Sequence, residues 1–284
     1  MNPFSTWQIN WDDKVTNLTR IAEDLKIGID SFVFIDDSAF ECDWVRKQLS
    51  QVAVVQLDGK ISSYRNILNG LGFFDSLTFS EEDRNRSGMY VQAKERKQLL
   101  QSALSLEEYL FDLQLQAEIG VPGKIEIPRI SQLTQKTNQF NLTSHRYTEG
   151  EIKSFLESSN SEVYYLRLGD RISDLGIVGV AILKFEDNLA EIDSFLFSCR
   201  ALGRGAEDAL LVFVTKRVFE EGKNLLTGKY LQTPKNSQVV HFYKKHGFQI
   251  TDENDEWTNW SYLIEPESKN VLAYPKWISV KLIS

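Results

Sequence analysis

The sequence has 284 residues, enough for one large or two medium domains that each bury a hydrophobic core. Hydrophobic residues make up 42% of it and charged residues 25%, which excludes disordered and fibrous proteins. The net charge of -8 argues against a nucleic-acid partner, because phosphates require a basic surface. No apolar run approaches the roughly 18 residues of a membrane helix, and the first residues do not resemble a signal peptide. We therefore expect a cytoplasmic protein with no membrane partner.

The N-terminal part alternates predicted helices and strands. Apolar residues at helical spacing predict helices over 15–27 and 41–49, and short apolar runs at 31–37 and 52–57 predict strands. Helix, strand, helix, strand is the order of a parallel α/β sheet.

Two adjacent carboxylates, Asp36 and Asp37, follow the first predicted strand. Ligands of α/β proteins bind outside the carboxyl ends of the strands, so the pair indicates a site. The same residues also fit the start of a helix, because Ser38 and Glu41 have the spacing of a capping box and Asp37 lies near the positive end of the helix dipole. The residues themselves leave both interpretations open.

The rest of the chain changes in character. Residues 88–115 are rich in helix formers and precede a segment with Gly and Pro, which places a domain boundary close to residue 115. Helices are predicted over 126–141 and 148–159. Three successive strands, which suggest an antiparallel meander, are then predicted over 163–170, 176–185 and 189–198.

The strongest motif is the turn that joins the last of these strands to an amphipathic helix. Its residues are Arg200, Leu202, Gly203, Arg204 and Gly205. Small residues let backbone amides approach a ligand and the helix N-terminus adds a positive dipole, so a pyrophosphate is a suitable ligand. Two glycines can also serve only to make the turn.

This turn resembles the R/Q-x-x-G-x-G/A loop of GNAT-type acyltransferases, which binds the pyrophosphate of a coenzyme A or phosphopantetheine-type donor. Residues 225–248, which end in "FYKKHGF", resemble a second signature of the same enzymes. There Asn236 takes the position of a residue that contacts the donor, and Tyr243 that of the acid that protonates the leaving thiolate. The resemblance implies a GNAT-like acyltransferase domain.

Segments along nearly the whole chain resemble the FkbH-like proteins, which join a haloacid dehalogenase-type (HAD) phosphatase domain to a GNAT-like domain. The most distinctive is "TNQFNLT", residues 137–143; others are "SLEEYL", "GIVGVAIL", "SCRALGRG" and "TPKNSQVVHFYKKHGF". The resemblance implies transfer of a glyceryl-type acyl group onto an acyl carrier protein, in polyketide biosynthesis or related secondary metabolism.

The same resemblance implies roles for Lys14, Asp36 and Asp37. In HAD phosphatases a Lys steadies the phosphoaspartyl intermediate and an acidic pair helps to hold Mg²⁺, which prefers carboxylate oxygens. The D-x-D-x-T motif that supplies the HAD nucleophile occurs nowhere in the sequence, so the covalent intermediate cannot form. We therefore expect no phosphatase activity from this chain alone.

The predicted fold class is α/β, with α+β character in the second domain. Residues 1–80 are expected to form the C-terminal portion of a HAD-like domain, 81–115 a helical connector and 116–284 a GNAT-like domain. The chain would then be a fragment of an FkbH-like protein, one half of a split gene, or a relative that kept only the acyltransferase. A separate subunit that bears the HAD nucleophile is an implied partner.

Other residues are weighed for chemistry. Cys199 beside the glycine turn could be a reactive thiolate or a small buried hydrophobe. Glu191 and Asp193 alternate on one strand and could provide a general base, although exposed strand acids are commoner. The cysteines lack C-x-x-C spacing, and no metal pattern surrounds His145 or His246; His241 is expected at the surface of a helix.

Two functions are consistent with these residues. The first is an acyltransferase that binds phosphopantetheine at residues 200–205 and uses Tyr243 as its acid. The second is a non-catalytic module that binds a carrier protein or a separate HAD subunit.

Overall fold

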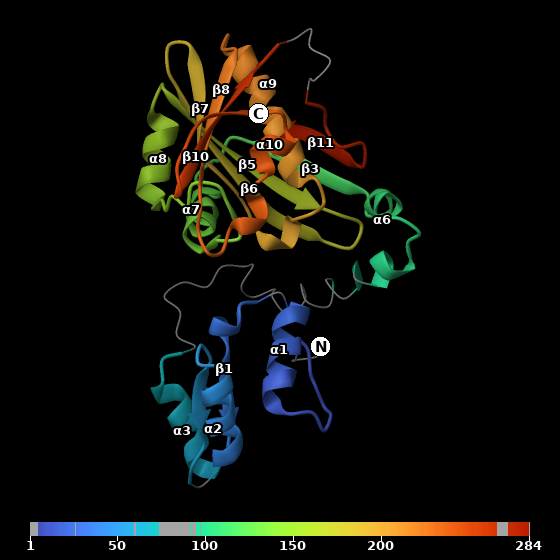
Figure 1. Ribbon diagram of the computed structural model, residues 1–284, viewed down its shortest axis with the longest axis vertical. Helices are drawn as coiled ribbons and strands as arrows, with labels where there is room; N and C mark the ends of the chain where they lie inside the picture. The colour runs from blue at the N-terminus through green and yellow to red at the C-terminus, as the bar shows by residue number, and fades with distance from the viewer. Residues whose placement is uncertain are drawn as a thin grey trace. The chain divides into compact units, whose positions relative to one another are not determined.

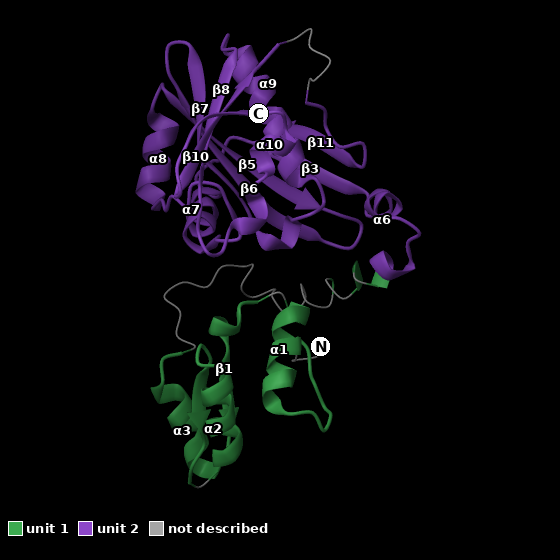
Figure 2. Ribbon diagram, viewed as in Figure 1, with its two compact units in different colours: residues 1–98 green, residues 99–284 purple. Residues whose placement is uncertain are grey.

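The computed structural model describes residues 5–25, 27–59, 61–73, 92, 95, 96, 98–265 and 272–283. The chain forms two compact units, residues 1–98 and 99–284, coloured separately in Figure 2. The division lies between Gln98 and Leu99, whereas the sequence placed a boundary close to residue 115. Residues 81–91 of the predicted connector lie outside the described residues, and its C-terminal part belongs to the second unit.

The first unit places short helices around a two-stranded sheet. Its elements are α1 (Lys14–Leu25), a 3-10 helix (Ile29–Ser31), β1 (Val33–Asp36), α2 (Ala39–Gln48), β2 (Ala53–Gln56) and α3 (Ile61–Gly70). The strands are parallel, as predicted, with Asp36 opposite Gln56 at their carboxyl ends. The core of the unit is small and centres on the buried side chains of Leu18, Cys42 and Val45.

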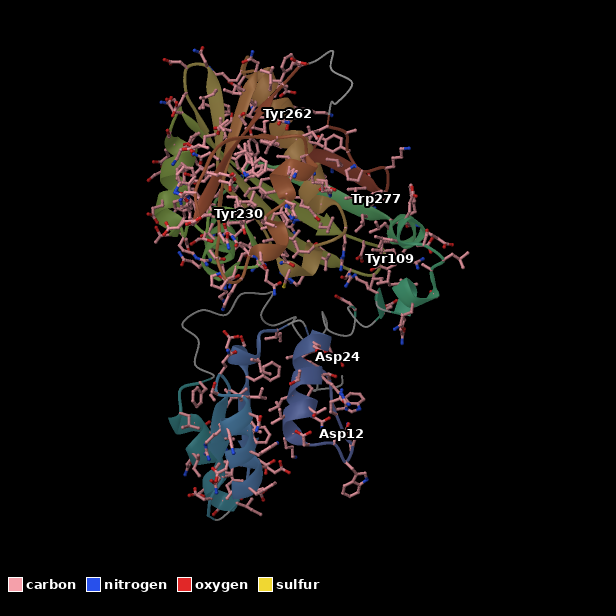
Figure 3. The ribbon with its side chains drawn as sticks, viewed as in Figure 1. Asp12, Asp24, Tyr109, Tyr230, Tyr262 and Trp277 are labelled. Atoms are coloured by element: carbon pink, nitrogen blue, oxygen red, sulfur yellow. The ribbon has the colours of Figure 1, made fainter. Side chains whose placement is uncertain are left out.

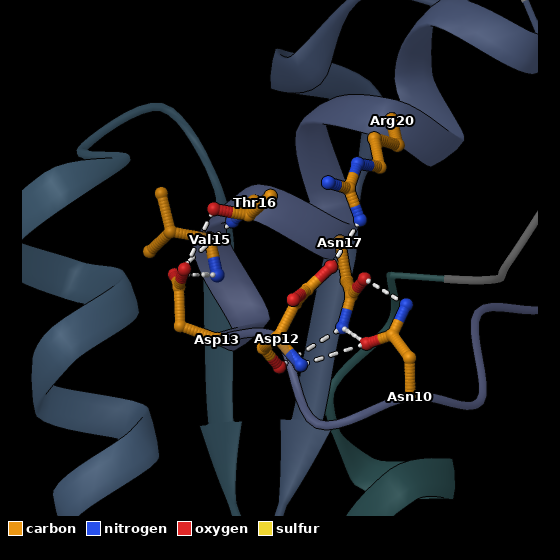
Figure 4. Close-up of polar contacts among 7 residues, drawn as sticks. All are labelled: Asn10, Asp12, Asp13, Val15, Thr16, Asn17 and Arg20. Atoms are coloured by element: carbon orange, nitrogen blue, oxygen red, sulfur yellow. Dashed lines mark hydrogen bonds and ion pairs between the residues drawn. The ribbon is translucent and has the colours of Figure 1, made fainter.

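The turn before α1 is held by its own side chains (Figure 4). Asp13 accepts hydrogen bonds of 3.0 and 3.1 Å from two amides of the first helical turn, which would otherwise lack partners. Asn10 and Asn17 exchange two further hydrogen bonds of 3.0 and 2.9 Å. These contacts fix the position of Lys14, the first residue of α1.

The second unit is built on one mixed sheet of nine strands (Figure 1), in the order β11-β3-β5-β6-β7-β8-β10-β9 with β4 paired to β7. Its helices are α6 (Leu106–Asp112), α7 (Ile127–Lys136), α8 (Glu149–Glu157), α9 (Ala206–Glu220) and α10 (Phe242–Lys245). Its strands are β3 (Leu115–Gly120), β4 (Phe140–Asn141), β5 (Ser161–Gly169), β6 (Asp174–Phe185), β7 (Leu189–Phe197), β8 (Leu225–Leu231), β9 (Gln249–Glu253), β10 (Trp257–Leu263) and β11 (Ile278–Ile283).

The predicted meander is confirmed, because β5, β6 and β7 pair antiparallel in succession. Two hydrophobic cores lie on the sheet: α7 and α8 contribute to one, and α6, α9 and α10 to the other. In the part of the chain that the structure describes, no helix has the length and apolarity needed to cross a membrane.

One predicted helix is shorter than expected. The segment 126–141 was predicted as helical throughout, but α7 ends at Lys136 and residues 140–141 form β4. The tight packing of Phe140 and Leu142, which are 5% and 0% exposed, overrides the helical pattern. Phe140 stacks edge-on against Phe197 and Phe242, which an uninterrupted helix would not allow.

Candidate functional site

The parallel strands β7 and β8 pair over only four residues each before they separate. At this point the β6–β7 ladder contains a bulge: Leu183 lies opposite Ile192 and Ile182 lies opposite Ser194, which leaves Asp193 without a partner. A bulge bends its strand and disrupts pairing, so β8 parts from β7 just beyond Ile192.

A segment from the loop after α7, residues 140–143, lies between the separated strands. On one side, Phe140 is paired with Phe197 of β7, and the Leu142 amide donates a 3.2 Å hydrogen bond to the Phe195 carbonyl. On the other side, the Leu142 carbonyl accepts a 2.7 Å hydrogen bond from the Leu231 amide of β8. The segment therefore fills the gap as a short additional strand.

Asn236 is fully engaged within the fold. Its side-chain oxygen accepts hydrogen bonds from the Tyr230 hydroxyl at 3.1 Å (Tyr230 is labelled in Figure 3) and from the Thr233 amide at 2.8 Å. Its nitrogen donates to the carbonyls of Asn141 and Leu231 at 3.0 and 2.9 Å. All four hydrogen-bonding positions of the buried amide are used. The predicted contact with a donor therefore requires some of these bonds to break.

Tyr243 lies where β7 and β8 stop pairing. Gly228 is the last residue of β8 that pairs with β7. A Cβ atom added there would lie 2.3 Å from the Tyr243 hydroxyl oxygen, so only glycine fits at this position. The side chain is 1% exposed, and burial raises the pKa of Tyr243. Among the described residues, only three buried side-chain polar atoms have no hydrogen-bond partner: the Tyr243 hydroxyl, Trp260 Nε1 and Glu207 Oε2. The Tyr243 hydroxyl is thus protonated and free to donate.

The glycine turn has the predicted position between β7 and α9. Gly203 and Gly205 have φ of +73° and +81°, a conformation that L side chains rarely adopt. Space beside Gly203 is open, whereas a Cβ at Gly205 would approach Pro275 and Trp277 at 3.1 and 3.2 Å. The Trp277 indole donates to the Arg204 carbonyl at 2.8 Å, which closes one side of the turn.

The other predicted residues of the turn make internal contacts. The Arg204 guanidinium lies 3.4 Å from the buried carboxylate of Asp170, and Arg200 donates a 3.3 Å hydrogen bond within the turn. Leu202 packs against the core, and Cys199 is a half-buried free thiol. The structure thus places all the predicted residues at the glycine turn. Their role in binding a donor remains a prediction.

A carboxyl group of the chain itself binds in this turn. The Gly203 amide donates a 3.3 Å hydrogen bond to Glu207 Oε1, and the other oxygen of Glu207 is buried without a partner. Burial raises the pKa of Glu207. The loop that the sequence predicts to bind pyrophosphate therefore already holds an acidic group.

The bulged residue Asp193 is the centre of a polar cluster that the sequence did not predict. Its carboxylate is 3% exposed; it accepts a 2.7 Å hydrogen bond from the Tyr147 hydroxyl, pairs with Lys184, and lies 3.5 Å from His145 Nδ1. Burial tends to raise the pKa of Asp193, but the hydrogen bonds from His145, Lys184 and Tyr147 outweigh it and hold this pKa well below its usual range. No sequence pattern links 145–147 to 193, because long-range pairing of residues 140–142 with β7 brings the loop to the bulge.

In the first unit, two of the predicted HAD residues lie together. Lys14 Nζ is 3.4 Å from Asp36 Oδ2, and Asp36 also accepts a 2.9 Å hydrogen bond from the Ser38 amide. Ser38 in turn caps α2 by accepting from the Glu41 amide, so the helix-start interpretation also holds. Over the described ranges, no group of three or more His, Cys, Asp or Glu residues could hold a metal ion. Magnesium binding by Asp36 and Asp37 thus has no support from the geometry.

No family model matches the sequence, and no curated protein matches it. The chain is similar in structure to the ribosomal-protein-S18-alanine N-acetyltransferase from Escherichia coli, with 13% identity over 54% of this chain and 97% of the other and a TM-score of 0.42. It is also similar to the PaiA N-acetyltransferase from Thermoplasma acidophilum in complex with coenzyme A (16% identity, 52% and 98% covered, TM-score 0.40). A third similarity is to a GNAT family acetyltransferase from Elizabethkingia anophelis with acetyl-CoA bound (18% identity, 41% and 84% covered, TM-score 0.33).

The Asp193 cluster predicts a pH-dependent stability. The hydrogen bond to Asp193 raises the pKa of His145, against the opposing effects of burial and of the Lys184 charge. A group with a raised pKa contributes its stabilisation fully below its unfolded value of about 6.5 and loses it as the pH rises through the folded value. His145→Gln should therefore lower the free energy of unfolding more at pH 5.5 than at pH 8.5, measured by urea denaturation. The same loss at both pH values would contradict the ion pair. In a protein that already carries Asp193→Asn, the effect of His145→Gln on the free energy of unfolding should be the same at both pH values.

Proposed function

We propose that the second unit transfers an acyl group from a thioester on a phosphopantetheine arm. The observation that carries the proposal is the separation of β7 from β8 at Asp193, beside the Tyr243 hydroxyl, which has no hydrogen-bond partner. An extended arm with amide groups can pair with the strand edges that such a separation exposes, as an added strand does. The glycine turn at the end of β7 offers amides and a helix N-terminus for the phosphate of the arm.

The chemistry follows from these positions. An acceptor nucleophile attacks the thioester carbonyl, the carbon–sulfur bond breaks, and the leaving thiolate requires a proton. The buried hydroxyl of Tyr243 remains protonated and has no other partner, so it can donate to the sulfur. Asp193 on the bulge and His145 in the loop before α8 lie 3.5 Å apart and provide a carboxylate–imidazole pair that can take the proton of the acceptor.

The source of the arm is a finer part of the proposal. The Glu207 carboxyl already takes the hydrogen bond of the Gly203 amide, so the glycine turn has one donor fewer for the oxygens of a diphosphate. An arm attached to a carrier protein brings one phosphodiester rather than the diphosphate of coenzyme A. This consideration favours the acyl carrier protein implied by the resemblance to FkbH-like proteins. The glyceryl-type group and the role in polyketide biosynthesis rest on that resemblance alone.

The second candidate function is a module that binds a carrier protein without catalysis. The filled gap between β7 and β8 favours it, because residues 140–143 occupy the edges to which an arm would bind. The engagement of all four positions of Asn236 points in the same direction.

Gly203→Val tests the glycine turn. A β-branched residue at φ +73° displaces the turn and its amide, so affinity for a phosphopantetheinylated carrier protein should fall at least about tenfold in calorimetric titration. Gly222→Val is a matched control, because Gly222 has φ +72° and equally open surroundings but follows the far end of α9. Equal affinities of the two variants would refute donor binding at the turn.

Tyr243→Phe tests the proton donor. Because the hydroxyl has no partner, its loss should leave thermal stability unchanged or raise it slightly. Turnover should fall roughly 100-fold with little change in donor affinity, as expected for a group that acts in the transition state. Turnover at the wild-type rate would show that Tyr243 serves only in packing.

A further inference from the structure

We infer that residues 140–143 are a displaceable segment that closes the donor site, so that a donor binds only when this segment leaves the gap between β7 and β8. The inference rests on the proposed function, since it assigns a regulatory element to the same site. It is carried by the contacts of the segment, by the occupied glycine turn and by the way the two ends of the loop are anchored.

The segment makes the contacts that an extended amide-bearing arm would make. Its main chain bonds to the Phe195 carbonyl on β7 and to the Leu231 amide on β8. The side chain of Leu142 is completely buried in the hydrophobic core, so the segment is packed as part of the sheet. A phosphopantetheine arm and this segment cannot occupy the same strand edges together.

The glycine turn, where the phosphate of the arm is predicted to bind, is also occupied by a part of the chain. The Gly203 amide, which faces the predicted phosphate position, binds the carboxyl group of Glu207 instead. A backbone segment thus takes the place of the amide-bearing arm, and a carboxyl group takes the place of the phosphate. Two separate parts of the chain, residues 140–143 and Glu207, therefore stand in for two parts of one ligand.

The loop is built so that the segment can move without unfolding its neighbours. The helix α7 is closed before it by the Thr137 amide, which donates to the Leu133 carbonyl, and α8 begins after it with the capping box of Thr148 and Glu151. Between these caps, Ser144 has φ +58°, a left-handed conformation that costs energy for a residue other than glycine.

Side chains of the loop hold the segment against the bulge. The Thr143 hydroxyl donates a 2.9 Å hydrogen bond to the Asp193 carbonyl, and the Tyr147 hydroxyl donates one of 2.7 Å to the Asp193 carboxylate. His145 lies between them in the chain and faces the same carboxylate. The Thr143 bond ends when the segment leaves the gap, and the Tyr147 bond holds the adjoining part of the loop in its closed position. Removal of these two bonds should therefore increase the fraction of molecules that can bind a donor.

The test uses a release variant, Thr143→Val combined with Tyr147→Phe. Its matched control is Thr215→Val combined with Tyr164→Phe, which removes donated hydrogen bonds of the same lengths, 2.9 and 2.7 Å, away from the segment. Each tyrosine hydroxyl also loses one second contact, Tyr164 with Arg217 and Tyr147 with His145. Affinity for 4′-phosphopantetheine is measured by calorimetric titration of the full chain. The release variant should bind at least about tenfold more tightly than both the wild type and the control.

Equal, measurable affinities of all three proteins would overturn this inference and leave the proposed donor site standing. The absence of binding by all three, with folding verified by circular dichroism, would refute the donor site and this inference with it. If the double variant does not fold, Thr143→Val is compared with Thr215→Val, and a smaller gain in affinity is expected from the first alone.

Discussion

One additional residue in β7, the bulged Asp193, lies where the pairing of β7 with β8 ends and the candidate site begins. The bulge ends the pairing of β7 with β8, and the same residue then holds the loop that fills the resulting gap. Its carbonyl accepts from Thr143 and its carboxylate accepts from Tyr147. Asp193 thus both ends the pairing of the two strands and contacts the loop that fills the gap between them.

The buried carboxylate of Asp193 explains why this arrangement is specific. A buried charge without partners is costly, and Asp193 draws its partners from β6, through Lys184, and from the loop, through His145 and Tyr147. Lys184 and His145 are each about half exposed, so solvent weakens both ion pairs. The ion pairs that hold the loop are therefore weak, as the proposed displacement of the loop by a ligand requires.

Much of the framework could be predicted from residue patterns. The parallel pair β1–β2, the meander of β5 to β7 and the strand–turn–helix at 189–220 each follow from local periodicity and turn chemistry. Lys14 and Asp36 were expected to act together, and their side chains are 3.4 Å apart. These features are encoded within short stretches of sequence.

The closed site could not be predicted in the same way. The strand β4 has two residues, too few for a periodic signal, and its partner on β7 lies more than fifty positions later. Local propensity in residues 137–141 therefore predicted a continuation of α7. The engagement of Asn236 and the Asp193 cluster depend likewise on long-range pairing, and the motif around Asn236 describes a donor contact without showing that the amide is already used.

Amide hydrogen exchange at Leu142 and Leu231 tests the central claim most directly. Both amides donate hydrogen bonds within the gap, the first to the Phe195 carbonyl and the second to the Leu142 carbonyl. The account predicts slow exchange at both in the protein alone, and loss of protection at Leu142 when 4′-phosphopantetheine binds. Fast exchange at both amides in the protein alone, or full protection of Leu142 with the ligand bound, would contradict it.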